Sequence, residues 1–212
     1  MEKLGKHQGN AKVSLELRLS LDSELAEQRA YRLKLQGDEQ WSVRGLRRQE
    51  AAGVRAAWRR EQERLRRAGE LLDTVDVLAA HGIELELRDR DWWDRRWPAV
   101  PDEAMDPGRW PGSRDGGYPK QVPLRLPQPL ARKTYAACWH SSYKAILELR
   151  KWREQNPGIV PRRVRRRTGG RGVAELEEYE RLAAQVTTVG DVYRAGLLRG
   201  IGAAEALRSR RS

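Results

Sequence analysis

The sequence contains only one cysteine, no phenylalanine and no long apolar segment. A single thiol, Cys138, excludes an internal disulfide and any zinc site built from several cysteines. No apolar run approaches the roughly 20 residues of a transmembrane helix, and the N-terminal residues lack the apolar stretch of a signal peptide. We therefore expect a soluble, cytoplasmic protein that does not contact a membrane.

Recognisable catalytic motifs are also missing. The sequence has no G-x-x-x-x-G-K-[ST], G-x-S-x-G or H-E-x-x-H pattern, so nothing indicates a nucleotide hydrolase, a serine hydrolase or a zinc protease. The three histidines, His7, His81 and His140, have no partner at a metal-ligand spacing. The sequence predicts neither an enzyme nor a cofactor, and it indicates no small-molecule substrate.

Positive charge is the strongest feature of the composition. The chain has 42 basic against 30 acidic residues, which gives a formal net charge of +12, and its sequence pI is near 10.3. Only eight of the basic residues are Lys, and 34 are Arg. Such an excess attracts polyanions, and Arg forms bidentate contacts to phosphate and guanine that Lys cannot form. Nucleic acid is therefore the predicted class of partner.

Proline is confined to the middle of the chain, since all ten prolines lie between residues 98 and 161. This distribution suggests five segments: an N-terminal helical domain with two short strands (1–97), a Pro/Gly-rich linker (98–119), a strand–helix–helix unit (120–156), a basic linker (157–172) and a C-terminal helical hairpin (173–212). The predicted fold class is mainly α with a few short β-strands, an α+β arrangement.

The two strands of the N-terminal domain are predicted from alternation. Apolar and polar residues alternate over 13–21 and again over 83–88, the period of a half-buried strand. Between them we expect a helix over 23–36 and a long amphipathic helix over about 43–80. Because the two strands flank these helices, we expect them to pair with each other.

Residues 119–153 read PKQVPLRLPQPLARKTYAACWHSSYKAILELRKWR. The run 121–126 predicts a strand with an apolar inner face formed by Val122, Leu124 and Leu126, and an outer face formed by Gln121, Pro123 and Arg125. Two amphipathic helices are expected after it. Ser141 and Ser142 separate them, because serine is a good cap for the start of a helix.

The strand carries side chains that suit base recognition. A two-stranded antiparallel ribbon fits the major groove of DNA, where Arg125 pairs with guanine and Gln121 with adenine. The amides at the start of the second helix, near Ser141 and Ser142, are expected to hold a phosphate. The structural alternative is a strand and a helical hairpin that only pack against the first domain.

In this order of parts the segment resembles the ribbon-helix-helix family of dimeric DNA-binding proteins, over about 35 residues. The resemblance rests on V-P-L-R-L-P, Leu130, Ala137, the serine pair and Ile146. It implies a homodimer with the ribbon in the groove. It also implies that Gln121, Pro123 and Arg125 face DNA and that Ser141 and Ser142 lie near phosphate.

Two further segments are strongly basic. Between Arg44 and Arg67 there are nine Arg against three Glu, so one face of that helix must be positive, either as a solvated face or as a phosphate contact. Arg132 and Lys133 are further candidate phosphate anchors. The linker adds Arg162, Arg163, Arg165, Arg166 and Arg167, which we expect to bind phosphate with little sequence preference.

These features predict a sequence-preferring protein that binds double-stranded DNA as a homodimer on the nucleoid, in transcriptional control or as an accessory factor of mobile DNA. One alternative is a protein–protein assembly factor with non-specific RNA or DNA affinity, in which the C-terminal hairpin mediates assembly. Another is a Mg²⁺-dependent nuclease that uses Asp89, Asp91 and Asp94. Interleaved arginines favour salt bridges around a Trp-lined corner at those three residues.

Overall fold

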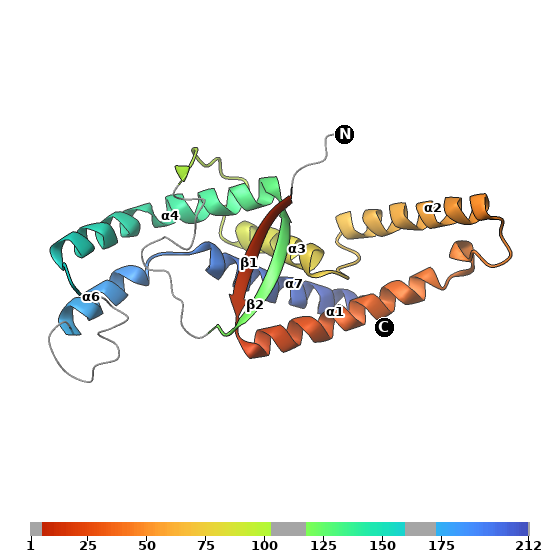
Figure 1. The fold of residues 1–212 in the computed structure, drawn as a ribbon, viewed down its shortest axis with the longest axis horizontal. Helices are drawn as coiled ribbons and strands as arrows, with labels where there is room; N and C mark the ends of the chain where they lie inside the picture. The colour runs from red at the N-terminus through yellow and green to blue at the C-terminus, as the bar shows by residue number, and fades with distance from the viewer. Residues whose placement is uncertain (1–5, 103–117, 160–172, 212) are drawn as a thin grey trace.

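Two strands that lie more than a hundred residues apart in the sequence form an antiparallel ribbon on one side of a helical body (Figure 1). The structure is a computed structural model, and it describes residues 6–102, 118–159 and 173–211. Its elements are β1 (Lys6–Val13), α1 (Leu15–Gln36), the 3₁₀ turn η1 (Glu39–Trp41), α2 (Arg48–Arg67), α3 (Val75–Asp89), β2 (Lys120–Pro127), α4 (Gln128–Gln155), α6 (Val173–Ala183) and α7 (Val189–Arg211). The predicted fold class, mainly α with a few short strands, is confirmed.

The ribbon has an apolar face and a polar face. The predicted strand over 121–126 is confirmed as β2, and the predicted inner face of Val122, Leu124 and Leu126 is buried. The partner of β2 is β1 of the same chain, with Lys12 opposite Gln121 and Gln8 opposite Arg125. The ribbon therefore forms within one copy of the chain.

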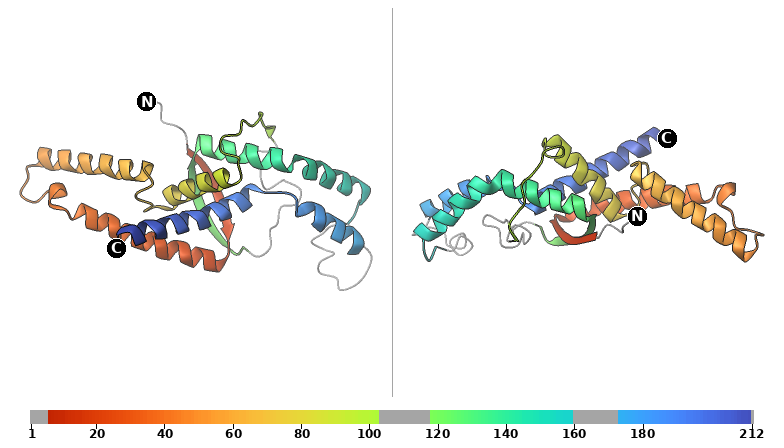
Figure 2. Two further views of the ribbon diagram at one scale, coloured as in Figure 1. Left: turned by 180° about the vertical axis from the view of Figure 1, so that it is seen from behind. Right: turned by 90° about the horizontal axis from the view of Figure 1, so that it is seen from above.

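The apolar face of the ribbon packs on helices that come from every part of the sequence. α3, α4 and α7 lie behind it, and α1 runs away from its lower end (Figures 1 and 2). One hydrophobic core joins Leu21 of α1, Ile83 of α3, Ile146 of α4 and Leu197 of α7. The segment boundaries expected from the prolines therefore do not separate independent cores within the described residues.

The predicted strand over 13–21 is wrong, because β1 ends at Val13 and α1 begins at Leu15. Ser14 caps the helix by accepting a hydrogen bond from the amide of Leu17 at 3.1 Å. Leucine at every second position satisfies the strand period, but Leu17, Leu21 and Leu25 also satisfy the helical period and are the buried ones. The 23–36 helix is confirmed as the second part of α1.

The predicted long helix over 43–80 is two helices, α2 and α3, which are separated by a turn. Gly69 adopts a φ of +69°, a left-handed conformation that favours glycine and ends α2. The predicted strand over 83–88 is wrong, since these residues lie in α3. Their alternation is misleading because Glu86 is a buried ion-paired residue.

α4 is one continuous helix of 28 residues, so the predicted helix boundary at Ser141 and Ser142 is wrong. Its buried positions keep a helical spacing through the serines, from Cys138 to Ser142, Ala145 and Leu149. A serine in a helix interior is tolerated where its hydroxyl finds a hydrogen-bond partner.

The two helices expected in the C-terminal segment are confirmed as α6 and α7. They do not fold back on each other as a hairpin, because α6 packs on α4 and α7 packs on α3 (Figure 1). Thr188 and Asp191 cap α7 reciprocally: the Thr188 amide donates to the Asp191 carboxylate at 2.9 Å, and the Asp191 amide donates to the Thr188 hydroxyl at 3.1 Å. Among the described helices, none is long and apolar enough to cross a membrane.

Candidate nucleic-acid interface

The outward face of the β1–β2 ribbon gathers exposed amide and cationic side chains. We call this set the ribbon face; its members are Gln8, Asn10, Lys12, Gln121 and Arg125, and all five are exposed. Asn10 lies opposite Pro123, and the other four form the two cross-strand pairs Gln8–Arg125 and Lys12–Gln121. Amide, ammonium and guanidinium groups therefore share one face of a two-stranded ribbon.

The ribbon face is positively charged. Its two strands contain Lys6, Lys12, Lys120 and Arg125 and not one Asp or Glu. Arg125 is exposed, and its guanidinium takes part in no ion pair within the part of the chain that the structure describes. The predicted orientation of Gln121 and Arg125 toward solvent is confirmed.

The inward positions of β1 hold the ribbon against the helices. The Tyr135 hydroxyl lies 3.3 Å from Nε2 of His7, and the two rings meet edge to face. A Cβ atom on Gly9 would lie 3.4 Å from the ring of Tyr193, so β1 passes close over that tyrosine. These contacts fix the outer side chains of β1 in position because neighbouring residues of a strand point to opposite faces.

The outer edges of the ribbon are capped by side chains from three helices. The Arg125 amide donates to the carboxylate of Asp76 at 2.9 Å, at the start of α3. Arg194 of α7 donates to the Lys12 carbonyl at 3.2 Å, and Arg18 of α1 lies 3.5 Å from the Gln121 carbonyl. Edge groups used in this way are not available for pairing with a further strand.

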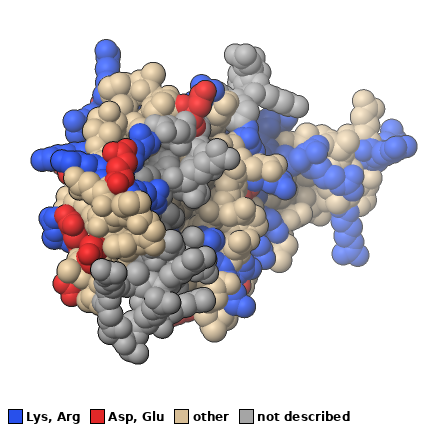
Figure 3. Space-filling model, turned by 60° about the vertical axis from the view of Figure 1, so that its left-hand side comes forward, with Lys and Arg blue, Asp and Glu red and all other residues tan. Residues whose placement is uncertain are grey.

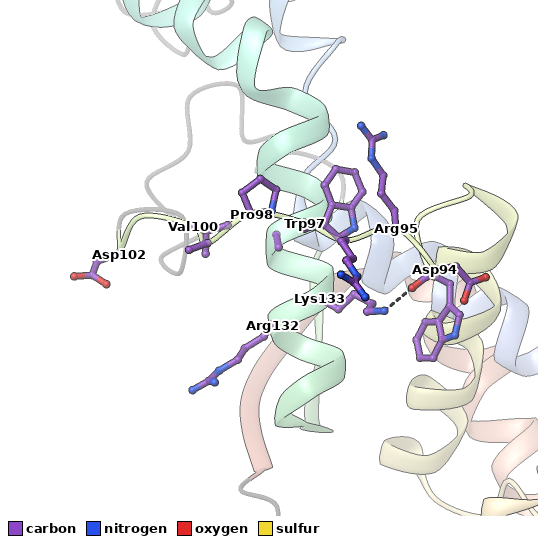
Figure 4. A pocket seen from close by; sticks show the side chains of 12 residues that line it. Asp94, Arg95, Trp97, Pro98, Val100, Asp102, Arg132 and Lys133 are labelled. Carbon is purple, nitrogen blue, oxygen red and sulfur yellow. Dashed lines mark hydrogen bonds between the residues drawn. The ribbon is translucent and has the colours of Figure 1, made fainter.

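Arg132 and Lys133, two of the predicted phosphate anchors, leave the first turns of α4 in different directions (Figure 4). Arg132 is exposed and lies in no ion pair of the described chain. The Lys133 ammonium donates to the carbonyl of Trp93 and lies 4.7 Å from the centre of the Trp93 ring. Arg132 is therefore free to contact phosphate, whereas Lys133 is engaged inside the protein.

Beside these two residues, segment 93–102 and α4 enclose a groove of about 930 Å³ (Figure 4). Its tryptophans are already covered by cations, since Arg95 lies 4.5 Å from the centre of the Trp97 ring. The ring of His140, on α4, is parallel to the ring of Trp97, and the ring centres lie 6.1 Å apart. The groove is thus a corner built from cation–π contacts.

One acidic residue of this corner, Asp89, has a structural partner in another helix. Asp89 pairs with Arg199, and Asp91 adopts a φ of +56° where α3 ends. Within residues 6–102, 118–159 and 173–211 no group of three or more His, Cys, Asp or Glu is arranged to hold a metal ion. The expected salt bridges between the acids of 88–97 and the interleaved arginines are not among the ion pairs of the described residues: Asp89 pairs with Arg199 of α7, and Arg88 and Arg90 pair with Glu84 and Glu86 of α3.

The predicted phosphate role of the two serines is wrong for Ser142. Its side chain is buried, its hydroxyl donates to the Thr187 carbonyl at 3.3 Å, and it accepts from the Thr187 amide at 2.9 Å. Ser141 is exposed in the middle of α4 and donates to the Cys138 carbonyl at 3.2 Å. Because neither residue starts a helix, the exposed amides that would bind phosphate do not exist there.

Two further predictions concern Cys138 and the arginines of the basic linker. Cys138 is fully buried, and burial raises the pKa of its thiol, so it does not act as a nucleophile next to His140. The predicted arginine anchors at 162, 163, 165, 166 and 167 lie outside the described residues.

Sequence reasoning missed the three residues of β1 on the ribbon face, Gln8, Asn10 and Lys12. A weak signal was present, since polar and less polar residues alternate through KHQGNAKV. The inward positions are His7, Gly9, Ala11 and Val13, and the first three carry too little apolar surface to stand out as a core strand.

No protein-family model, curated protein or solved structure matches this chain.

Proposed function

We propose that this chain binds nucleic acid, with double-stranded DNA as its preferred form, through the ribbon face. The observation that carries the proposal is the composition of that surface: Gln8, Asn10, Lys12, Gln121 and Arg125 are exposed on one ribbon whose strands contain no carboxylate. These residue types are the ones that read base edges and bind phosphate.

The shape of the ribbon supports a duplex as the target. A two-stranded antiparallel ribbon enters the major groove of B-form DNA, which is about 12 Å wide. Strands of eight residues span about 26 Å at roughly 3.3 Å per residue. The major groove of duplex RNA is too deep and narrow for side chains to read, so the same surface favours DNA.

The chemistry of the ribbon face supports readout of both kinds of base pair. Arg125 suits guanine, which offers the acceptors O6 and N7 to a guanidinium. The amides of Gln8, Asn10 and Gln121 suit adenine, which offers one donor and one acceptor. Lys12 adds a cation at the same surface, where it meets either guanine or a phosphate.

Additional cations would add contacts to the phosphate backbone. Arg132 lies one helical turn beyond the end of β2, and the arginines at 162–167 are expected to add affinity without preference. Because β1 and β2 pair within one chain, this activity does not require the homodimer that the ribbon-helix-helix resemblance implies. Transcriptional control and service to mobile DNA are the roles we propose for it.

The proposal is tested by selecting bound fragments from a random duplex pool and measuring their affinity by gel shift. Wild type, the double variant Gln8→Ala/Arg125→Ala and the control Arg153→Ala are compared on the selected duplex and on a scrambled one. Arg153 is an exposed arginine at the far end of α4, so it matches the loss of charge without touching the ribbon face.

We expect a preference for the selected duplex in the wild type and the control, and its loss in the double variant. Duplex RNA and heparin, added at equal phosphate concentration, should compete less well than the selected DNA. Equal competition by all three polyanions, together with no effect of the double variant, would overturn the proposal and favour an assembly factor with non-specific affinity.

A further inference from the structure

We infer that α2 is a second, sequence-independent contact that holds the phosphate backbone of the nucleic acid read by the ribbon face. The α2 stripe, as we call it, consists of Arg48, Arg55 and Arg59. This inference rests on the proposed function for its ligand, but it concerns another part of the molecule and predicts a different measurable property.

The three arginines of the α2 stripe lie on one face of the helix. Their spacing of seven and four residues corresponds to about two turns and one turn, so the side chains point in nearly the same direction. From Arg48 to Arg59 the stripe extends about 16 Å along the helix, at 1.5 Å per residue. All three residues are exposed. They form a straight row of cations.

Of the other four arginines of α2, three are ion-paired, and Arg60 is exposed and, among the described residues, in no ion pair. Arg64, Arg66 and Arg67 are ion-paired, with Glu61 at 2.8 Å, with Asp73 at 2.8 Å and with Glu63 at 3.1 Å. Among the residues that the structure describes, no acid pairs with Arg48, Arg55 or Arg59. The arginines at the C-terminal end of α2 are therefore paired with acids, whereas the three of the stripe are not. The one acid of the first turns, Glu50, accepts a hydrogen bond from the Arg47 amide at 2.9 Å.

The position of α2 makes the stripe accessible. The second half of α1, η1 and α2 form an arm that extends away from the helical body (Figure 1). The arm is anchored at its base by Asp73, which is buried and accepts hydrogen bonds from Arg32 of α1 at 3.0 Å and Arg66 of α2 at 2.8 Å. Its tip, where α2 begins, bends toward the side of the molecule that carries the ribbon (Figure 2).

The surface of the arm suits a polyanion better than a protein. In the space-filling view the arm shows Lys and Arg among neutral side chains, whereas the near end of the molecule mixes basic and acidic ones (Figure 3). The large apolar residues of α2 lie on another face, where Trp58 is buried against Trp41 at a ring-centre distance of 5.2 Å. Protein interfaces need an apolar centre poor in charge, and the stripe itself offers none.

The experiment measures how the affinity for duplex DNA changes with salt. The triple variant Arg48→Gln/Arg55→Gln/Arg59→Gln is compared with a control that removes three ion-paired arginines, Arg64→Gln/Arg67→Gln/Arg88→Gln. Arg88 belongs in the control because it pairs with Glu84 at 2.7 Å. Each variant replaces three arginines, so both lose the same charge. Fluorescence anisotropy is recorded with the selected and the scrambled duplex between 50 and 200 mM KCl, after thermal melts confirm that both variants are folded.

Each phosphate contact lowers the slope of log K against log salt by about 0.9. The triple variant should therefore lose about 2.7 of the slope on both duplexes, while its preference for the selected duplex stays unchanged. The control should keep the slope of the wild type. A triple variant that behaves like the control would overturn the inference and assign the stripe to another partner, such as an acidic protein.

The outcome also separates this inference from the proposed function. A wild-type protein that fails to bind duplex DNA contradicts both. A wild type that binds without sequence preference, together with a reduced slope in the triple variant, contradicts only the reading role of the ribbon face and supports the contact at α2.

Discussion

Gly82 of α3 and Gly200 of α7 lie so close that a Cβ atom on Gly82 would come within 2.5 Å of the backbone nitrogen of Gly200. The same Cβ atom would overlap the carbonyl oxygen of Gly196, one turn earlier in α7. The two helices meet backbone to backbone at this point. Both helices also contact the ribbon, α3 through β2 and α7 through β1.

Replacing Gly82 with alanine should destabilise the protein by about 3 kcal/mol, the upper part of the range for overpacked cores, because backbone atoms cannot move aside. Gly202→Ala on α7 is the matched control, since a Cβ atom there meets nothing within 4 Å. It should stabilise the helix by about 1 kcal/mol. Urea unfolding measures both variants. Equal effects of the two substitutions would contradict the close crossing.

Half of the ribbon was predictable from the sequence and half was not. Val122, Leu124 and Leu126 are large apolar residues at every second position, which no helix would bury on one face. In β1 the corresponding inward residues include Gly9 and Ala11, whose fit depends on Tyr193 behind them. That fit is a property of the assembled core, which local patterns do not contain.

Alternation misled where leucine occurs at every second position. Leu15, Leu17, Leu19 and Leu21 satisfy the strand period, but Leu17 and Leu21 alone, with Leu25, also satisfy the helix period, and the choice is made by the Ser14 cap and by the core. In the helix Leu15 and Leu19 are 52% and 61% exposed, whereas the predicted strand would have buried all four leucines on one face. Tertiary contacts therefore outweigh local alternation at this position.

The buried hydroxyl of Ser142 provides a second stability test. Ser142→Ala removes both hydrogen bonds to Thr187 and leaves the Thr187 amide without its hydroxyl acceptor. This change should lower the free energy of unfolding by about 2 kcal/mol. Ser141→Ala, at an exposed neighbouring position, should change stability by less than about 0.5 kcal/mol. Thermal melts and gel shifts on both variants check this, and we expect unchanged DNA affinity in each. Weaker DNA binding by Ser142→Ala at unchanged stability would instead support a phosphate contact.

The ion pairs of Asp73 predict how stability depends on pH. Burial of the Asp73 carboxyl opposes its ionisation, but the hydrogen bonds and charges of Arg66 and Arg32 outweigh burial, and its pKa lies below the usual value. The unfolded chain, with an Asp pKa of about 3.9, then binds a proton more readily than the folded chain does. The stabilisation is complete above that value and is lost as the pH falls through the lower pKa of the folded state.

Asp73→Asn should therefore lower the free energy of unfolding at pH 7 by about 3 kcal/mol, the cost of breaking a buried ion pair. It should also reduce the loss of stability between pH 5 and pH 2, because the titrating group is gone. Asp22→Asn, which breaks an exposed pair with Arg18, should cost less than about 1 kcal/mol. Urea unfolding at several pH values gives both quantities. A parallel pH profile for Asp73→Asn and wild type would contradict the assignment.

Arg125→Lys tests the ribbon face at the level of a single contact. Lysine keeps the positive charge but lacks the planar fork that pairs with both guanine acceptors. The variant should therefore bind a scrambled duplex as the wild type does, and lose about 1–3 kcal/mol of discrimination at one guanine of the selected site. Competition with duplexes changed at each position in turn locates that guanine. A uniform loss on every sequence would show that Arg125 contacts phosphate, and an unchanged preference would show that it does not face the DNA.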